Sequence, residues 1–446
     1  MQNYLIKNIT VVNEGASKVM DVLLSDNKIE RIDLNISTNK KVVEINGENK
    51  HLLPGVIDDQ VHFREPGLTH KATIYTESKA GIAGGVTSFM EMPNTVPPVF
   101  TQRLLEEKFD IAKNSALSNF SFFMGTSNDN AEEALRTNDK KKEVCGIKIF
   151  LGSSTGGLLV DNFLTIDRIF ANSEVLIATH CEDEKIIAKN RKEITAKKSK
   201  LDASDHPRIR NEEACYESSS AAVQIAKKHG TRLHILHIST EKELDLFSNK
   251  IPLKEKRITS EVCVHHLHFS SEDYDRLGNL IKCNPAIKAP FHRQALWEGL
   301  LDDRLDIIAT DHAPHTLEEK QEPYEKAYAG LPLVQHPLLL MLHYVKTGKI
   351  SLEKVVEKMS HAVANCFQIN NRGFIRESYQ ADLVIADLHS KTTVQKENLY
   401  FKCGWSPLEG RTFSAGITHT FVNGHLVYNN GTWNENVKGE RLQFDR

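Results

Sequence analysis

Short apolar runs alternate with amphipathic segments of helical period through most of the chain, and this alternation restricts the possible folds more than any other feature. A short apolar run followed by a helical pattern is typical of a strand-helix unit in a parallel sheet. Helical patterns lie at Thr101–Asn114, Asn211–Lys228 and Arg293–Leu301. The eight apolar runs are Gly55–Phe63, Gly85–Met92, Phe120–Met124, Gly146–Phe150, Val175–His180, Leu233–Ile238, Ile258–His265 and Asp306–Asp311. Eight such units predict a (β/α)8 barrel of the TIM type.

The two ends of the chain have a different texture, with short strand patterns separated by Asn, Gly and Asp turn signals. The strand patterns are Tyr4–Val12, Val19–Ser25, Lys28–Asp33, Asp382–Ala386, His419–Val422 and His425–Tyr428. Neither end has enough apolar residues to fold alone, so we expect one small β-sandwich domain built from both. The expected division is 1–52 and 374–446 for the small domain and 53–373 for the barrel.

Composition excludes several classes of protein. The 446 residues include 56 Lys and Arg and 59 Asp and Glu, so no charge excess favours binding to nucleic acid or to a membrane surface. No apolar run reaches the roughly 18 residues of a membrane helix, and no signal-peptide pattern begins the chain. Seven scattered cysteines without a C-x-x-C pair favour reduced thiols in a cytoplasm, with neither a disulfide framework nor a cysteine zinc site. The basic stretch Lys189–Arg210 is expected to be a solvated loop.

Polar residues at the ends of the predicted barrel strands are the candidate functional groups, because active sites of this fold gather at the carboxyl ends of the strands. Side chains alternate along a strand, so Gln60 and His62 share a face. The same alternation places His234 and His237 on opposite faces. His237, nearer the strand end, is therefore the candidate, and His234 is expected to pack against a helix.

Lys148 lies among bulky apolar residues in the fourth run, Gly146–Phe150. A buried ammonium is costly and usually pairs with a carboxylate. Desolvation also lowers the pKa of such a lysine and exposes a neutral amine, which can react with carbon dioxide to form a carbamate, an anionic oxygen ligand. Both interpretations are open from the residues alone.

Together, His62, Lys148, His180, His237 and Asp311 place nitrogen and oxygen donors at five strand ends. This combination predicts a metal site, and donors without thiolate suit zinc, which polarises carbonyl groups and lowers the pKa of a bound water to about 7. Asp311 could ligate the metal, transfer protons, or do both.

Several longer motifs resemble those of the dihydroorotase family in the amidohydrolase superfamily. They are Pro54-Gly55-Val56-Ile57-Asp58, Gln60-Val61-His62-Phe63-Arg64-Glu65-Pro66-Gly67, Met92-Pro93-Asn94-Thr95, Lys148-Ile149-Phe150, His180, Leu236-His237-Ile238-Ser239, Asn284-Pro285 and Asp311-His312-Ala313-Pro314-His315. The resemblance covers nearly the whole chain. It implies reversible cyclisation of the small molecule N-carbamoyl-L-aspartate to L-dihydroorotate in pyrimidine synthesis, and a homodimer.

The resemblance also implies roles for individual residues. His62, His180 and His237 would be zinc ligands, with Asp311 both a ligand and the general acid and base. Lys148 would be a carboxylated lysine bridging two metals, because the stretch Gly152–Gly157 has no aspartate to take that place. The substrate-binding residues would be Arg64, Asn94 and His315, which hold the free carboxylate, and Asn284 near the ring.

The chain departs from the family at Gln60, where the family has the first histidine of a His-x-His motif. A glutamine carbonyl is a poorer zinc donor than imidazole. We therefore expect one firmly held zinc, on the carbamate of Lys148, His180 and His237, and a weaker or absent second zinc at Gln60, His62 and Asp311. Two alternatives stay open, a hydantoinase or allantoinase that shares the metal ligands, and a catalytically silent relative.

Overall fold

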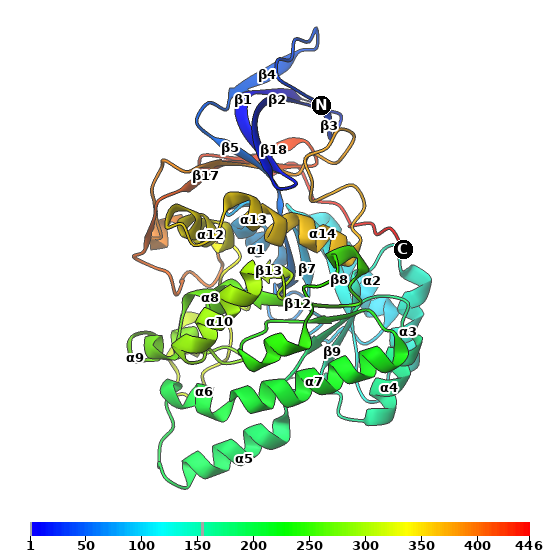
Figure 1. Cartoon of the computed structure of the whole chain (residues 1–446), viewed down its shortest axis with the longest axis vertical. Coiled ribbons are helices and arrows are strands. Elements are labelled where there is room, and N and C mark those ends of the chain that lie inside the picture. Colours follow the sequence, from blue (N-terminus) through cyan, green and yellow to red (C-terminus); the bar gives the residue numbers. More distant parts are fainter. Residues whose placement is uncertain (1, 153–155) are drawn as a thin grey trace.

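The computed structural model describes residues 2–152 and 156–446, and its central feature is an eight-stranded parallel sheet (Figure 1). The strands of this sheet are β6 (Val56–Val61), β7 (Val86–Glu91), β8 (Asn119–Gly125), β9 (Gly146–Phe150), β10 (Ile177–His180), β11 (Leu233–Ile235), β12 (Ile258–Cys263) and β13 (Ile307–Ala309). Neighbours in the sheet follow sequence order. A parallel bridge between Val61 and His312 joins the last strand region to the first, so the sheet closes into the predicted barrel.

Burial explains why these short segments are strands. All seven residues of β8 are buried, as are all five of β9, because barrel strands are covered by side chains inside and by helices outside. The longer helices include α1 (Ile74–Ala83), α2 (Gln102–Ser115), α4 (Phe163–Asn172), α5 (Glu184–Thr195), α7 (Glu212–His229), α10 (Pro290–Leu301) and α12 (Pro337–Lys346). Shorter helices include α3 (Ala131–Leu135), α6 (His206–Ile209), α8 (Val264–His268), α9 (Tyr274–Leu277), α11 (Leu317–Gln321), α13 (Leu352–Val356) and α14 (Ala362–Phe367).

Local signals set the helix ends. Thr101 caps α2 by accepting a hydrogen bond from Leu104 N, and Asn211 caps α7 by accepting one from Ala214 N. Gly230 ends α7 with φ of 67°, a left-handed conformation that glycine adopts without strain. The three helices predicted from periodicity are α2, α7 and α10.

No helix in the described part of the chain has the length and apolar character needed to cross a membrane.

Both ends of the chain contribute to a second sheet, which lies at one end of the barrel (Figure 1). Its strands are β1 (Asn3–Asn13), β2 (Ala16–Ser25), β3 (Lys28–Asp33), β4 (Val42–Asn46), β5 (His51–Pro54), β14 (Leu383–Asp387), β17 (Gly416–Val422), β18 (His425–Asn429) and β19 (Thr432–Trp433). The two ends meet where β5 pairs with β14 in antiparallel register, Pro54 opposite Leu383. A separate short ladder joins β15 (Thr392–Thr393) to β16 (Thr412–Phe413).

Two expectations about local structure were wrong. The run Ile258–His265 is not one strand, because β12 ends at Cys263 and α8 follows. The stretch Lys189–Arg210 is not one solvated loop, because it contains the end of α5 and all of α6, and His206 within it is buried. Asp183 begins α5 by accepting hydrogen bonds from Lys185 N and Ile186 N.

Candidate active site

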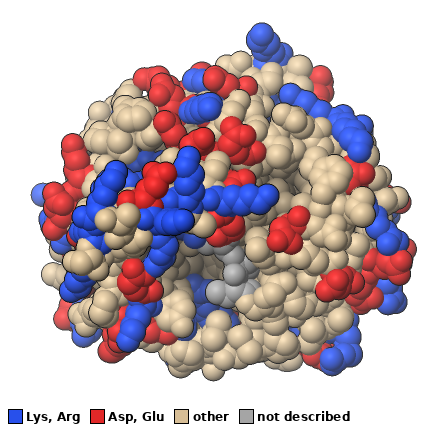
Figure 2. All heavy atoms as spheres, turned by 90° about the horizontal axis from the view of Figure 1, so that it is seen from below, with Lys and Arg blue, Asp and Glu red and all other residues tan. Residues whose placement is uncertain are grey.

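Every site residue predicted from the sequence lines one cavity of about 690 Å³ at the carboxyl ends of the barrel strands. These residues are Gln60, His62, Arg64, Asn94, Lys148, His180, His237, Asn284, Asp311 and His315. The stretch Gly152–Gly157 borders this cavity at Gly156, and residues 153–155 lie outside the described part of the chain. Viewed from below, the molecule is hollowed near its centre, with Lys and Arg side chains gathered on one side of the hollow (Figure 2).

Asp311 contacts Gln60, in the first barrel strand, and His62, just after it. Its Oδ1 accepts a hydrogen bond from Gln60 Nε2 at 3.2 Å and lies 3.1 Å from His62 Nε2. Asn94 Oδ1 lies 2.6 Å from His62 Nδ1. Because the Asn94 carbonyl can only accept, it holds the proton on His62 Nδ1 and leaves Nε2 free to act as a ligand. Burial lowers the pKa of His62, which also favours the neutral form.

Lys148 is buried in the barrel interior, and no carboxylate of the described residues pairs with it. Its Nζ lies 4.5 Å from the centre of the Phe150 ring, and no ion pair joins it to a described residue. Burial lowers the pKa of its amine to about 7. A substantial fraction of Lys148 is therefore a neutral, nucleophilic amine near neutral pH, which is the form that reacts with carbon dioxide.

His180 and His237 lie beside this amine. His180 Nδ1 is 2.9 Å from His237 Nε2, and His180 Nε2 is 2.9 Å from Glu182 Oε2. Although burial raises the pKa of Glu182, the Arg210 guanidinium and His180 hold it at about 2, so the carboxylate is ionised and orients the His180 ring.

His237 has a buried Nδ1 that makes no hydrogen bond with any described residue. Burial, with His180 next, holds the pKa of His237 well below its usual value, so the ring is neutral. A neutral imidazole with an unsatisfied buried nitrogen, next to a second imidazole and a neutral amine, fits a metal ligand. The three residues thus provide a donor set suited to zinc.

The opposite side of the cavity is basic. Arg64 donates from Nε to the Pro314 carbonyl at 3.0 Å, and its Nη2 lies 3.0 Å from His315 Nε2. Lys71 Nζ lies 3.1 Å from His315 Nδ1 and 2.8 Å from Glu319 Oε1. Burial lowers the pKa of Arg64 to about 10. This value is still well above 7, so the guanidinium is charged at neutral pH. This side of the cavity suits a carboxylate.

Some residues at this site were not predicted. Lys71 lies soon after the Arg-Glu-Pro-Gly motif, a position that could have identified it. Nothing in the sequence pairs Glu182 with Arg210, because α5 and α6 lie between them in the chain. Tyr328 also lines the cavity. Its ring stacks on the His315 ring with centroids 4.9 Å apart, and Lys71 Nζ lies 4.0 Å from the centroid of the Tyr328 ring.

The expectation that His234 packs against a helix is confirmed, because its ring lies 5.7 Å from the Phe367 ring of α14, but the strand alternation used to separate it from His237 does not hold. The His234 ring lies inside the barrel, with Nε2 3.2 Å from Glu261 Oε2 and 3.4 Å from Asp59 Oδ2. Alternation does not carry through to His237, because β11 ends at Ile235 and His237 adopts φ of 41°. Both histidines therefore reach the barrel interior, at different depths.

Comparisons with known proteins match most of the chain. The model of the amidohydrolase family matches residues 51–427. A dihydroorotase of Pyrococcus abyssi is 32% identical over 421 residues, covering 94% of this chain and 93% of that protein. A dihydroorotase of Halobacterium salinarum is 32% identical over 419 residues, covering 93% and 94% of the two chains.

Solved structures give the same barrel. The L-hydantoinase (dihydropyrimidinase) of Arthrobacter aurescens superposes with a TM-score of 0.90 at 25% identity, covering 97% of this chain and 98% of that one. The dihydropyrimidinase of Brevibacillus agri superposes with a TM-score of 0.89 at 22% identity over the full length of both chains, a likeness of fold.

Proposed function

The chain belongs to the amidohydrolase family, and on that premise we propose that it is a dihydroorotase, which interconverts N-carbamoyl-L-aspartate and L-dihydroorotate plus water in pyrimidine synthesis. One observation carries this proposal. A single cavity joins a set of metal-ligand donors to a basic side formed by Arg64, Lys71 and His315. The substrate needs both, since it has an amide to form or break and a free carboxylate to hold.

Lys148, His180 and His237 would hold the catalytic zinc, with Lys148 as its carbamate. The unsatisfied Nδ1 of His237 and the neutral amine of Lys148 support this donor set. Zinc bound there would polarise the reacting carbonyl and acidify a water molecule. Glu182 would keep the His180 ring in place as the outer hydrogen-bond partner that metal-bound histidines commonly have.

A second zinc at Gln60, His62 and Asp311 would be held less firmly. The Gln60 amide nitrogen donates to Asp311, and its carbonyl oxygen lies 3.7 Å from Cys263 Sγ. Gln60 can offer zinc only a neutral oxygen, a weaker donor than imidazole. The proposed enzyme therefore depends on one zinc.

Asp311 would be the general acid and base. During ring opening it takes the proton of the attacking water and passes it to the leaving amide nitrogen, and ring closure runs these transfers backwards. Closure therefore requires a protonated Asp311. Arg64, with its planar fork, would bind the substrate carboxylate together with Asn94 and His315, and Asn284 would lie near the ring.

A hydantoinase is the alternative favoured by the solved structures. Its usual substrates lack the carboxylate that the basic side of the cavity would bind. The test compares turnover of L-dihydroorotate, hydantoin and dihydrouracil by the purified protein, with zinc per chain measured on the same sample. We expect turnover of dihydroorotate alone. Preference for hydantoin would replace the proposal with the alternative, and zinc without turnover of any of the three would identify a silent relative.

We further propose that the enzyme acts in the cytoplasm, which its scattered cysteines favour, and that it forms a homodimer, as the family resemblance implies. Sedimentation equilibrium tests the second point, and a mass of one chain would contradict it.

A further inference from the structure

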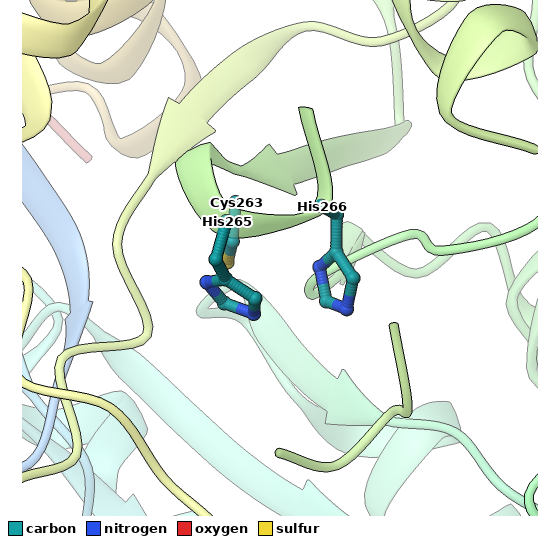
Figure 3. A group of neighbouring side chains, drawn as sticks. All are labelled: Cys263, His265 and His266. Carbon is teal, nitrogen blue, oxygen red and sulfur yellow. The ribbon is translucent and has the colours of Figure 1, made fainter. Parts of the chain in front are cut away.

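Three potential zinc ligands lie together where β12 ends and α8 begins, and none has a part in the proposed chemistry. Cys263 is the last residue of β12, and His265 and His266 lie in the first turn of α8 (Figure 3). The Cys263 sulfur and one nitrogen from each ring all lie within 4.8 Å of one another. The two rings are tilted by 44° to each other, with centroids 4.1 Å apart.

The hydrogen bonding of this cluster is incomplete. His265 is 1% exposed, and neither of its ring nitrogens makes a well-formed hydrogen bond with a described residue, although the Thr310 backbone acts on the ring as a weak partner. His266 Nε2 lies 3.1 Å from the Pro285 carbonyl, whereas its Nδ1 is buried without a partner in the described residues. Buried polar groups are nearly always satisfied, so three unsatisfied imidazole nitrogens in one place require an explanation.

A purely structural role explains only part of the cluster. The Cys263 thiol can donate weakly to Gln60 Oε1 at 3.7 Å or to Glu261 Oε1 at 3.9 Å. Neither contact involves His265. The His265 ring is therefore left with nitrogen atoms that these contacts do not use.

We propose that Cys263, His265 and His266 bind a zinc ion at the end of β12, separate from the metal held by Lys148, His180 and His237. One thiolate and two imidazoles are a common donor set for zinc. In a tetrahedral zinc complex these ligand atoms lie about 3.3 to 3.6 Å apart. In the structure they are up to 4.8 Å apart, so small rotations of the three side chains would bring them to zinc-binding distances.

The position of Gln60 supports this assignment. Because its amide nitrogen donates to Asp311, its carbonyl oxygen faces Cys263 and would be a fourth, neutral ligand once the thiol has lost its proton, which would withdraw that oxygen from the weak second zinc position of the cavity. Gln60 and Asp311 line the cavity, so a single side chain separates the cluster from the space through which an ion would enter. Binding would release the Cys263 thiol proton, since only the thiolate is a good ligand.

Replacing the metal with cobalt(II) tests the proposal. A thiolate bound to cobalt gives a charge-transfer absorption in the near ultraviolet, which a site with only nitrogen and oxygen donors does not give. We expect this absorption in the native protein and its loss in Cys263→Ser and His265→Gln. The matched control is Cys145→Ser, a buried cysteine elsewhere in the barrel, which should keep it.

The test also separates this site from the proposed catalytic zinc. Lys148→Ala should lose the catalytic metal and keep the thiolate absorption, whereas Cys263→Ser should lose one zinc per chain and keep the other. Native protein without the absorption after cobalt loading overturns the proposal, whether cobalt binds elsewhere or not at all. This measurement needs no variant, so a failure of Cys263→Ser to fold leaves the proposal testable.

Discussion

The amide nitrogen of Gln60 donates a hydrogen bond to Oδ1 of Asp311 at 3.2 Å, across the seam where the barrel closes. The same oxygen lies 3.1 Å from His62 Nε2. A histidine in place of Gln60 would present a nitrogen lone pair to a metal, whereas the glutamine presents a hydrogen-bond donor to the proposed general base. Where the family has a histidine that can bind metal, this chain thus has a glutamine that orients Asp311.

Gln60→His should increase zinc binding at the second position. The introduced imidazole would join His62 and Asp311, and zinc prefers nitrogen to a neutral amide oxygen. We expect more zinc per chain at limiting zinc, measured by equilibrium dialysis, with the first zinc unchanged. Gln60→Asn is the control, because it keeps the amide and adds no imidazole. Native protein that already holds two zinc ions tightly in this cavity would contradict the single-zinc interpretation.

Lys148→Ala should abolish turnover and remove the catalytic zinc, because the carbamate is the proposed anionic ligand. Lys148→Arg is an informative companion, since it keeps a long nitrogen-bearing side chain but stays protonated and does not form a carbamate near neutral pH. Both variants should fail to bind the catalytic zinc, and added short carboxylates should partly restore the alanine variant. Normal zinc content with normal turnover in Lys148→Ala would mean that the amine only packs against Phe150.

Arg64→Lys should weaken substrate binding without affecting the metal. The guanidinium can meet a carboxylate with two parallel hydrogen bonds, and an ammonium cannot. Loss of about 1.4 kcal/mol of binding would raise the KM for dihydroorotate roughly tenfold. Arg208→Lys, at a side chain that is 65% exposed, is the control. A fall in zinc content in Arg64→Lys would identify a structural residue instead.

His206→Gln should change how stability depends on pH. Burial, with Arg210 next, lowers the pKa of His206 to about 3, and its usual value is near 6.5. Between about pH 5 and 6 the unfolded chain therefore binds a proton at His206 that the folded chain does not, so His206 destabilises the fold as pH falls.

The native free energy of unfolding should accordingly lose about 1.4 kcal/mol per pH unit more than that of His206→Gln over this range. Urea denaturation at several pH values measures the difference. His70→Gln, at a side chain that is 60% exposed, should follow the native curve. Parallel curves for native protein and His206→Gln would show that His206 is protonated in the fold.

His234→Leu should destabilise the barrel. Its imidazole lies between the buried carboxyl groups of Asp59 and Glu261. Although burial lowers the pKa of His234, Cys366 and then Asp59 and Glu261 raise it well above its usual value. Removing one member of a buried charged cluster typically costs about 3 to 5 kcal/mol. The midpoint of urea unfolding measures the loss, with His70→Leu as the exposed control. A change below about 1 kcal/mol would mean that the two acids are satisfied without His234.

The alternation of apolar runs with segments of helical period located all eight barrel strands. Apolar runs that are buried on both faces differ clearly from the amphipathic helices between them. This alternation failed where chemistry and backbone conformation decide the outcome. The run Ile258–His265 is apolar enough to be one strand. In the structure the strand ends at Cys263, and Val264 and His265 already belong to α8. His237 reaches the cavity through φ of 41°, which no alternation rule anticipates.

The site was predicted as a set of residues but not as a network. Motifs and strand ends identified the lining of the cavity, since the barrel brings all carboxyl ends to one face. Which atoms meet depends on rotamers across the barrel, so the contacts of Gln60 with Asp311 and of Glu182 with Arg210 could not be read from the chain. Cys263, His265 and His266 do not have C-x-x-C spacing, so nothing in the sequence indicated that they cluster.

The pairing of β5 with β14 has a consequence for folding. Pro54 lies opposite Leu383, so the whole barrel is the loop that closes this ladder. Forming such a contact in an unfolded chain costs the entropy of a very long loop, whereas a folded barrel brings both ends close in advance. The barrel should therefore fold first, and the sheet of the two termini should be completed late, so hydrogen exchange during refolding should protect β8 before β5.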